Sequence, residues 1–345
     1  MSASRSVAVL GPIPRDRIIT HRGEVFEKYG CALYTVAALS ALLDADDRIY
    51  PIVHVRREDE EPIKELLSAF PNVDLTGVRS ASDHGAVVEL RYVDQNTRIE
   101  QQIGFMDPIT PADVEFALHA DAFVCVPITD YEVGQATLAY IKEHSAGTIL
   151  LDAHGPTSTL VIGGERRRRL WVERDSWLPH IDLLKMNLEE AGCSWFPSKI
   201  ALEHHDAGAP IATETLPEFA EHCLRHGVTA VCVTLDERGC AAYWLDENGE
   251  PEGQIYVPAV NWALDASPEV LDMLWGRYFA SGEYRALWRI VTMLPWSKER
   301  DSAERQKCGL SPMKWRCGAR TSRSRLVKLA RPPPEMRIFS PGKAA

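Results

Sequence analysis

The sequence predicts an α/β fold: a doubly wound, mostly parallel sheet flanked by helices, with a small β-sheet lid. Short apolar runs alternate along the chain with longer amphipathic or alanine-rich segments, which is the pattern of repeated β-α units. The run at 228–233, VTAVCV, is almost entirely β-branched or small, which suits a strand buried on both faces. A third observation predicts the lid: over 85–106 apolar and polar residues alternate, as they do in a strand with one polar face.

The main sheet and its helices follow from these runs in chain order. The apolar runs predict strands at 6–10, 49–55, 73–78, 122–126, 148–152, 181–186 and 228–233, and two short strands within 243–257 around a turn at 246–249. The segments between them predict helices at 29–43, 58–70, 111–119, 133–144 and 216–226. The helix at 29–43 is rich in small residues, which would let a ligand or another backbone approach closely.

The lid is predicted from a segment whose apolar residues alternate. Val88, Leu90 and Tyr92 alternate with polar residues, and a polar turn follows at 94–97. A polar-faced hairpin is out of place inside a parallel sheet. We therefore expect lid strands near 17–27 and 85–106, with Asp16 in the loop before a short strand at 17–20.

Composition limits the function classes. The formal net charge of −11 argues against a nucleic-acid partner. No stretch approaches the ~20 apolar residues of a membrane helix, so no membrane association is expected. The eight cysteines include no Cys-x-x-Cys pair, and several lie in apolar runs, so we expect reduced thiols and a cytoplasmic protein.

Polar residues at strand ends mark candidate binding positions, because ligands of open α/β sheets bind beyond the carboxyl ends of strands. The strand at 228–233 turns into polar residues over 234–239, which a nucleotide could contact or which could be an ordinary loop. Asp16 follows the first strand and could hold two hydroxyls of a sugar, or be a solvated loop residue. Asn187 and Glu190 open a helix, where they could organise Mg²⁺ and phosphate or form a capping box.

Other motifs are weaker or missing. The segment 152–155, DAHG, ends a strand at the ligand edge and could take part in a site. The basic run Arg166–Arg169 could be a nuclear-localisation or phosphate patch, but it is interpreted as the solvated start of a helix. Walker A, Gly-x-Gly-x-x-Gly and Gly-x-Ser-x-Gly sequences are all missing from the chain.

Four segments together resemble the ribokinase-like (PfkB) family of carbohydrate and nucleoside kinases. The resemblance covers about 6–260 and rests on 11–16 (GPIPRD), 30–33 (GCAL), 187–190 (NLEE) and 234–239 (TLDERG), together with the lid. It implies ATP-dependent, Mg²⁺-assisted phosphoryl transfer to a hydroxyl of a sugar or nucleoside, and a possible homodimer formed through the lid.

The resemblance also implies residue roles. Substrate binding is implied for Asp16, Gly30, Cys31 and Tyr34, nucleotide binding for Asn187, Thr234, Asp236 and Gly239, and a metal role for Glu190. Three positions depart from the pattern, since Tyr29 replaces a usual Gly, Tyr34 a usual Asn, and Asp236 a usual Gly. These departures bear on substrate identity more than on fold.

The largest departure follows residue 258. The family places a glycine-rich anion hole and a general-base Asp there, but this chain reads LDASPEVLD over 264–272, leaving Asp272 as the candidate base. Residues 259–345 carry 16 Lys/Arg against 8 Asp/Glu and five of the nine Trp. We therefore expect a domain over 1–260 and a divergent, partly disordered region over 261–345, for which a frame disruption near Asn261 is one hypothesis.

Three functions follow. The first is a carbohydrate kinase with Asp16 on the substrate, Glu190 on Mg²⁺ and Asp272 as base. The second is a catalytically impaired relative that binds sugar or nucleotide without turnover. The third is an unrelated α/β enzyme.

Overall fold

The computed structural model describes residues 4–94, 97–196, 209–235, 239–246 and 248–256. All of them belong to the unit Met1–Pro295, and the second unit, Trp296–Ala345, lies outside the described residues. Within the described part of the chain, every helix falls short of the length and apolar character that a membrane-spanning helix requires.

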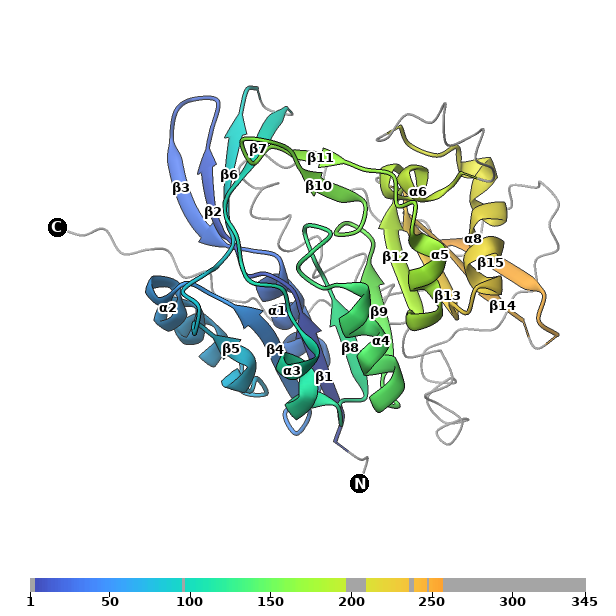
Figure 1. The fold of residues 1–345 in the computed structure, drawn as a ribbon, viewed down its shortest axis with the longest axis horizontal. Helices are drawn as coiled ribbons and strands as arrows, with labels where there is room; N and C mark the ends of the chain where they lie inside the picture. Colours follow the sequence, from blue (N-terminus) through green and yellow to red (C-terminus); the bar gives the residue numbers. More distant parts are fainter. Residues whose placement is uncertain (1–3, 95–96, 197–208, 236–238, 247, 257–345) are drawn as a thin grey trace, which may run out of the picture. The chain divides into compact units, whose positions relative to one another are not determined.

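A large, mostly parallel sheet forms the centre of the fold (Figure 1). Its strands are β1 (Ser6–Leu10), β4 (Arg48–His54), β5 (Val78–Arg79), β8 (Ala122–Cys125), β9 (Thr148–Asp152), β12 (Leu183–Asn187), β13 (Ala230–Thr234), β14 (Cys240–Leu245) and β15 (Pro251–Tyr256). Among the described residues the order is β15-β14-β13-β12-β9-β8-β1-β4-β5. The strands from β5 to β13 pair in parallel, and β14 and β15 are antiparallel. The predicted doubly wound sheet is confirmed.

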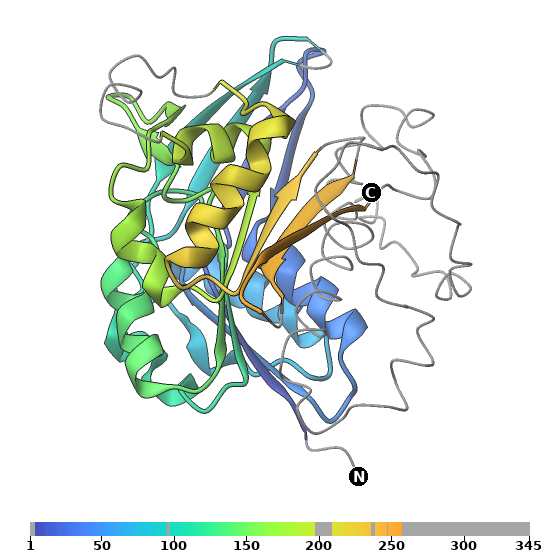
Figure 2. The same cartoon turned by 90° about the vertical axis from the view of Figure 1, so that its right-hand side faces the viewer.

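Helices cover both faces of this sheet. Those described are α1 (Ala32–Leu42), α2 (Arg57–Ser68), α3 (Pro111–Val114), α4 (Gln135–His144), α5 (Arg174–Trp177), α6 (Leu188–Ser194) and α8 (Leu216–Arg225), with single 3-10 turns η1 (Leu75–Gly77), η2 (Glu115–Ala117), η3 (Leu178–His180) and η4 (Thr213–Thr215). Figure 2 shows α1 and α2 on one face and α4, α5 and α8 on the other. The core lies between these layers, where Phe123, Ile149 and Phe219 are fully buried.

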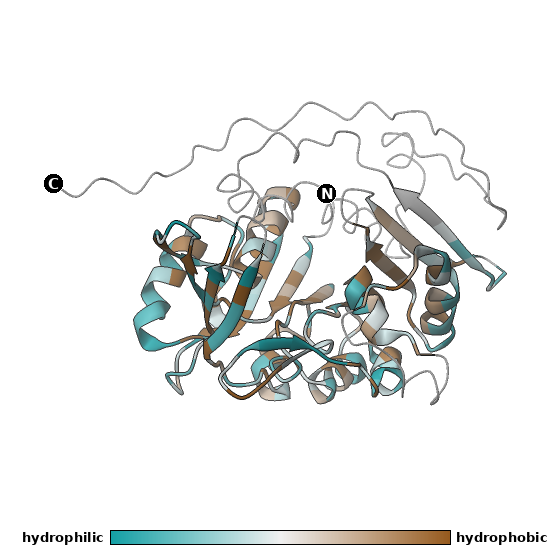
Figure 3. Ribbon diagram, turned by 90° about the horizontal axis from the view of Figure 1, so that it is seen from above, coloured by the Kyte–Doolittle hydropathy of each residue, from teal (hydrophilic) through white to brown (hydrophobic). Residues whose placement is uncertain are grey.

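The sheet strands are buried because both of their faces are covered. All four residues of β8 and all five of β13 are buried, in keeping with their continuous apolar sequence. Figure 3 shows mainly hydrophobic residues at the centre of the sheet, whereas the helices mix both kinds.

Two smaller sheets complete the fold. The lid contains β2 (Arg15–Ile19), β3 (Val25–Tyr29), β6 (Val87–Tyr92) and β7 (Arg98–Gly104), in the order β3-β2-β6-β7. From the sequence we also expect the 85–106 hairpin to pair with the segment 18–26, and the pairing of β6 with β2 confirms this. A hairpin of β10 (Ser158–Leu160) and β11 (Arg166–Arg168) lies beside the lid (Figure 1).

Several local predictions were wrong. Asp16 is not in a loop, because β2 begins at Arg15 and pairs with β3 and β6. The helix expected from Tyr29 begins only at Ala32, because Tyr29 ends β3. Most of the strand expected at 73–78 is a 3-10 turn, because the Asp74 side chain accepts the Thr76 N–H.

The helix expected at 111–119 is similarly broken into α3 and η2. The basic run is also not the start of a helix. Arg166–Arg168 forms β11, which pairs with β10 in antiparallel register.

Candidate functional site

The candidate site lies where the order of the large sheet reverses direction. From β1 the chain continues to β4 on one side and returns later to β8 on the other. Such a switch point is the usual ligand position in an open α/β sheet. Gly11 follows β1 and Val126 follows β8. A Cβ on Gly11 would lie 2.6 Å from the Val126 carbonyl oxygen, so the carboxyl ends of β1 and β8 are close together.

One face of the lid presents polar side chains toward this point. The strand register pairs Asp16 with Lys28 and with Val88, and pairs Val88 with Gln102. Residues paired across neighbouring strands share a face, so Asp16, Lys28 and Gln102 lie on the same side of the lid. Glu100 lies two residues before Gln102 on β7 and therefore shares that face. Asp16 and Glu100 are close enough for each to influence the titration of the other.

The Asp16 carboxylate lies close to Gly30. A Cβ on Gly30 would lie 2.5 Å from Asp16 Oδ2 and 3.5 Å from the Tyr34 ring. The structure therefore brings together three predicted substrate residues, Asp16, Gly30 and Tyr34. Burial raises the pKa of Asp16 to about 7, against the lowering effect of the Lys28 and Arg166 charges.

Cys31, the fourth predicted substrate residue, occupies the N-cap of α1 with φ of +49°. Its thiol donates to the Val126 carbonyl oxygen at 3.2 Å. Burial, with the nearby carboxylates of Glu132, Asp152 and Asp16, raises the pKa of this thiol well above its usual value. The Cys31 thiol thus links the start of α1 to the end of β8 by a hydrogen bond. Because its pKa is raised, the thiolate form is disfavoured, which argues against a nucleophilic role.

Asn187 and Glu190 lie at the end of β12 and form a capping box. The Asn187 side chain accepts the Glu190 N–H at 2.8 Å, and Glu190 Oε2 accepts the Asn187 N–H at 2.8 Å. Asn187 also pairs in register with Thr234 at the end of β13. The structure therefore places Asn187, Glu190 and Thr234 at one edge of the sheet.

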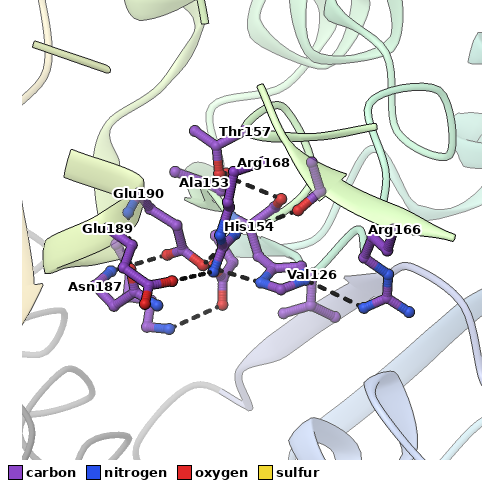
Figure 4. Close-up of polar contacts among 12 residues, drawn as sticks. Val126, Ala153, His154, Thr157, Arg166, Arg168, Asn187, Glu189 and Glu190 are labelled. Carbon is purple, nitrogen blue, oxygen red and sulfur yellow. Dashed lines mark hydrogen bonds and ion pairs between the residues drawn. The ribbon is translucent and has the colours of Figure 1, made fainter. Parts of the chain in front are cut away.

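His154 connects Glu190 to a basic residue near the lid (Figure 4). His154 Nδ1 lies 2.9 Å from Glu190 Oε1, and Arg166 Nη1 lies 3.4 Å from His154 Nε2. One tautomer satisfies both contacts: Nδ1 donates to Glu190, and Nε2 accepts from Arg166.

The charge of Glu190 is stabilised by its neighbours. Burial alone would raise the pKa of Glu190, but the hydrogen bond from His154, with the charges of Lys185 and Arg168, outweighs it and lowers the pKa. The Arg168 guanidinium lies 3.3 Å from Glu190 Oε1. Glu190 is therefore a buried carboxylate surrounded by positive and hydrogen-bonding groups.

Arg166 joins the lid to this cluster. Its Nη1 lies 3.2 Å from Glu100 Oε2 on β7, while the same nitrogen contacts His154. The β10–β11 hairpin is held against the lid by the Gln102 N–H, which donates to the Gly164 carbonyl oxygen at 2.8 Å. A continuous polar path thus runs from the lid through Arg166 and His154 to Glu190.

Two further acidic residues near this polar path, Asp152 and Glu132, are buried. Asp152 Oδ2 pairs with Lys185 Nζ at 3.1 Å in a buried position. Glu132 is fully buried, and its Oε2 accepts the N–H groups of Ile128 and Thr129 at 2.6 and 3.2 Å. Burial raises the pKa of Glu132 to about 7, despite these hydrogen bonds and the Arg166 charge.

The remaining predicted residues divide into two groups. Gly239 lies in the turn after β13, where its φ is +100° and its carbonyl oxygen accepts the Leu235 N–H at 2.7 Å. Asp236 and Asp272 lie outside the described residues.

The sequence reasoning missed Glu100, Arg166, Arg168 and Lys185, and Glu132 was not singled out. The charged run at Arg166–Arg169 was a visible signal for two of these residues, but the carboxylates that its side chains contact, Glu100, Asp130 and Glu190, are distant in the chain.

Glu190 is the predicted metal residue, and its surroundings favour an indirect contact with Mg²⁺. Its side chain is 2% exposed, and both oxygens already have protein partners. Such a carboxylate fits a role in orienting the water shell of the ion better than direct ligation.

Comparison with solved structures identifies the fold. A sulfate complex of a pyrophosphate-dependent kinase in the ribokinase family matches at 18% identity and a TM-score of 0.57, over 74% of this chain and 80% of that chain. Arabidopsis thaliana ribokinase complexed with ribose and ATP matches at 17% identity and a TM-score of 0.52, over 75% and 80%. Giardia lamblia ribokinase matches at 13% identity and a TM-score of 0.54, over 75% and 77%.

No family model and no curated protein sequence matches the chain. The structural likeness shows that the chain has a ribokinase-like fold, as the sequence motifs predicted.

Proposed function

We propose that this protein is a carbohydrate kinase. It binds a sugar or nucleoside beneath the lid and transfers a phosphoryl group to a hydroxyl of that ligand. The observation that carries this proposal is the placement of Asp16. Its carboxylate lies close to Gly30, which also neighbours the Tyr34 ring, near the switch point of a ribokinase-like sheet. A carboxylate there can accept hydrogen bonds from hydroxyl groups and orient a polyol.

The proposed roles divide the site into two halves. Asp16, Gly30, Cys31 and Tyr34 form the acceptor half. Asn187, Thr234 and Gly239 form the donor half with Asp236, and Glu190 orients the water shell of Mg²⁺. Phosphoryl transfer depends on positioning and charge stabilisation, and Arg166 and Arg168 supply positive charge between the halves.

The proposed donor is ATP with Mg²⁺. Pyrophosphate is the alternative to test, because structural neighbours include pyrophosphate-dependent kinases, one of them bound to a pyrophosphate analogue and myo-inositol.

A second candidate function is binding without turnover. It is favoured by the sequence LDASPEVLD over 264–272, which lacks the glycines of an anion hole. Loss of a general base costs roughly 10²- to 10⁴-fold in rate, and loss of an anion-hole donor about 10²- to 10³-fold. A chain lacking both would bind its ligands with negligible catalysis.

The deciding experiment measures ADP release from Mg-ATP, and phosphate release from pyrophosphate, with a panel of sugars, inositols and nucleosides. Acceptor-dependent release that is lost in Asp16→Asn and Asp272→Asn, but kept in the exposed control Asp46→Asn, would establish the kinase. Acceptor binding by calorimetry without release would establish the second function. Absence of both binding and release from a folded protein would refute both.

The proposal extends to the partner, the location and the domain organisation of the protein. We propose a small-molecule partner, a cytoplasmic location and a domain boundary near residue 260. A homodimer formed through the free lid edge at β3 is also proposed, and light scattering on the purified chain would show a monomer if it is wrong.

A further inference from the structure

A cluster of two histidines and one carboxylate lies away from the candidate active site. Asp175 belongs to α5, His222 to α8, and His226 caps the end of α8. One possible ligand atom from each of the three residues lies within 4.8 Å of the other two. All three side chains are at least partly accessible to solvent.

The two histidines have the spacing and orientation of a metal-binding pair. Residues four apart on a helix share a face, and the rings of His222 and His226 have centroids 4.1 Å apart. His226 Nδ1 lies 2.7 Å from the His222 carbonyl oxygen. A carbonyl can only accept, so Nδ1 carries the proton and Nε2 keeps a free lone pair, as in many metal-ligating histidines.

The carboxylate is also held in place. Asp175 Oδ1 lies 2.7 Å from His222 Nε2 and accepts a hydrogen bond from Arg174 Nε at 2.9 Å. Arg174 is buried and its guanidinium lies over the Phe196 ring, so this contact orients Asp175 from the protein side. The Arg174 charge opposes cation binding, which limits the affinity of the cluster.

We propose that Asp175, His222 and His226 bind a divalent transition-metal ion of the Zn²⁺ class. Two imidazole nitrogens and one carboxylate oxygen suit Zn²⁺, Ni²⁺ or Cu²⁺, whereas Mg²⁺ prefers oxygen ligands alone. The ion replaces the proton shared by His222 and Asp175 and leaves at least one coordination position for water.

This site is separate from the proposed kinase chemistry. His226 precedes the amino end of β13, and α5 leads through η3 to the amino end of β12. The candidate active site lies beyond the carboxyl ends of these same strands. A bound ion would therefore tie α5 to α8 without contacting Asn187 or Thr234.

The test is calorimetric titration of the full chain with Zn²⁺, compared with His226→Gln and Asp175→Asn. We expect one binding event that weakens at least about tenfold in each variant. His144→Gln is the matched control, because His144 also contacts the carbonyl oxygen four residues earlier but stacks on Tyr140. The control should bind Zn²⁺ like the wild type.

A second measurement reports the position of the ion. The Trp195 ring lies 5.6 Å from the His222 ring, so bound Cu²⁺ should quench Trp195 fluorescence. Comparison with Trp195→Phe isolates this component, and His226→Gln should abolish it. Unchanged Zn²⁺ affinity in both ligand variants, or no Zn²⁺ binding by the wild type, would overturn the proposal.

Discussion

His154 Nδ1 lies 2.9 Å from Glu190 Oε1, and this contact joins the ends of β9 and β12 at the candidate active site. Glu190 also caps its own helix through the Asn187 N–H. One carboxylate therefore both caps its own helix and contacts His154 at the candidate site. The capping box and the motif for Mg²⁺ and phosphate, which the sequence left as alternatives, are compatible uses of the same residues.

Replacement of His154 should weaken the folded state measurably. His154→Ala removes a hydrogen bond to a buried carboxylate, and hydrogen bonds to charged groups contribute about 1.5–3 kcal/mol. We expect a loss of that size in the free energy of unfolding, measured by denaturant titration at pH 7. His144→Ala, on the exposed end of α4, should change stability by less than about 0.5 kcal/mol. Equal effects of the two substitutions would contradict the assigned role of His154.

A methyl group at Gly30 should displace the Asp16 carboxylate. In Gly30→Ala the new Cβ would lie 2.5 Å from Asp16 Oδ2, the end of a side chain that can turn away, so we expect a destabilisation of only about 1 kcal/mol. A double-mutant cycle with Asp16→Ala measures the coupling, and the cost of Gly30→Ala should fall when the carboxylate is absent. Gly134→Ala is the control, since a Cβ there has open space. The same cost in both backgrounds would show that Asp16 is not the obstacle.

The elements that could be predicted from sequence are those with local signals. Alternation of Val88, Leu90 and Tyr92 was enough to predict the lid hairpin, although burial in β6 does not alternate strictly, since Val87 and Val88 are both buried. Buried runs such as 122–126 and 228–233 predicted β8 and β13, because both faces of the sheet are covered.

The failures concern residues whose conformation is decided by distant partners. Asp16 lies within a strand because β2 pairs with β6, about seventy residues away. Arg166 is an exception, because its strand partner is Leu160 of β10, in a short hairpin with Gly163 and Gly164 at the turn. Its contacts with Glu100 and His154 have no sequence signature, since they depend on where the lid is placed over the sheet.

Titration of Asp16 should make stability fall as pH rises. The folded state raises the Asp16 pKa from 3.8 to about 7, so between these values the folded protein keeps a proton that the unfolded chain releases. The stabilising contribution is present at low pH and is lost as pH rises through about 7.

The measurement is the difference in unfolding free energy between Asp16→Asn and the wild type at pH 5 and pH 8. We expect this difference to shift in favour of the variant at pH 8 by on the order of 1–3 kcal/mol. The exposed Asp46→Asn should show no such shift. A difference independent of pH would mean that Asp16 titrates normally in the folded protein.

Glu132 should be essential for the loop after β8, in a way that an amide can replace. Its Oε2 accepts the N–H groups of Ile128 and Thr129 in a fully buried position. Glu132→Ala leaves these donors without an acceptor, and each unsatisfied buried group costs about 1–3 kcal/mol. We expect Glu132→Ala to lose about 2–4 kcal/mol of unfolding free energy at pH 7, and Glu132→Gln to lose less than half of that because its carbonyl oxygen can accept the same bonds. Thermal and denaturant unfolding of the two variants will distinguish the outcomes. If both substitutions destabilise equally, the charge of the carboxylate, and not its capacity to accept these hydrogen bonds, holds the loop.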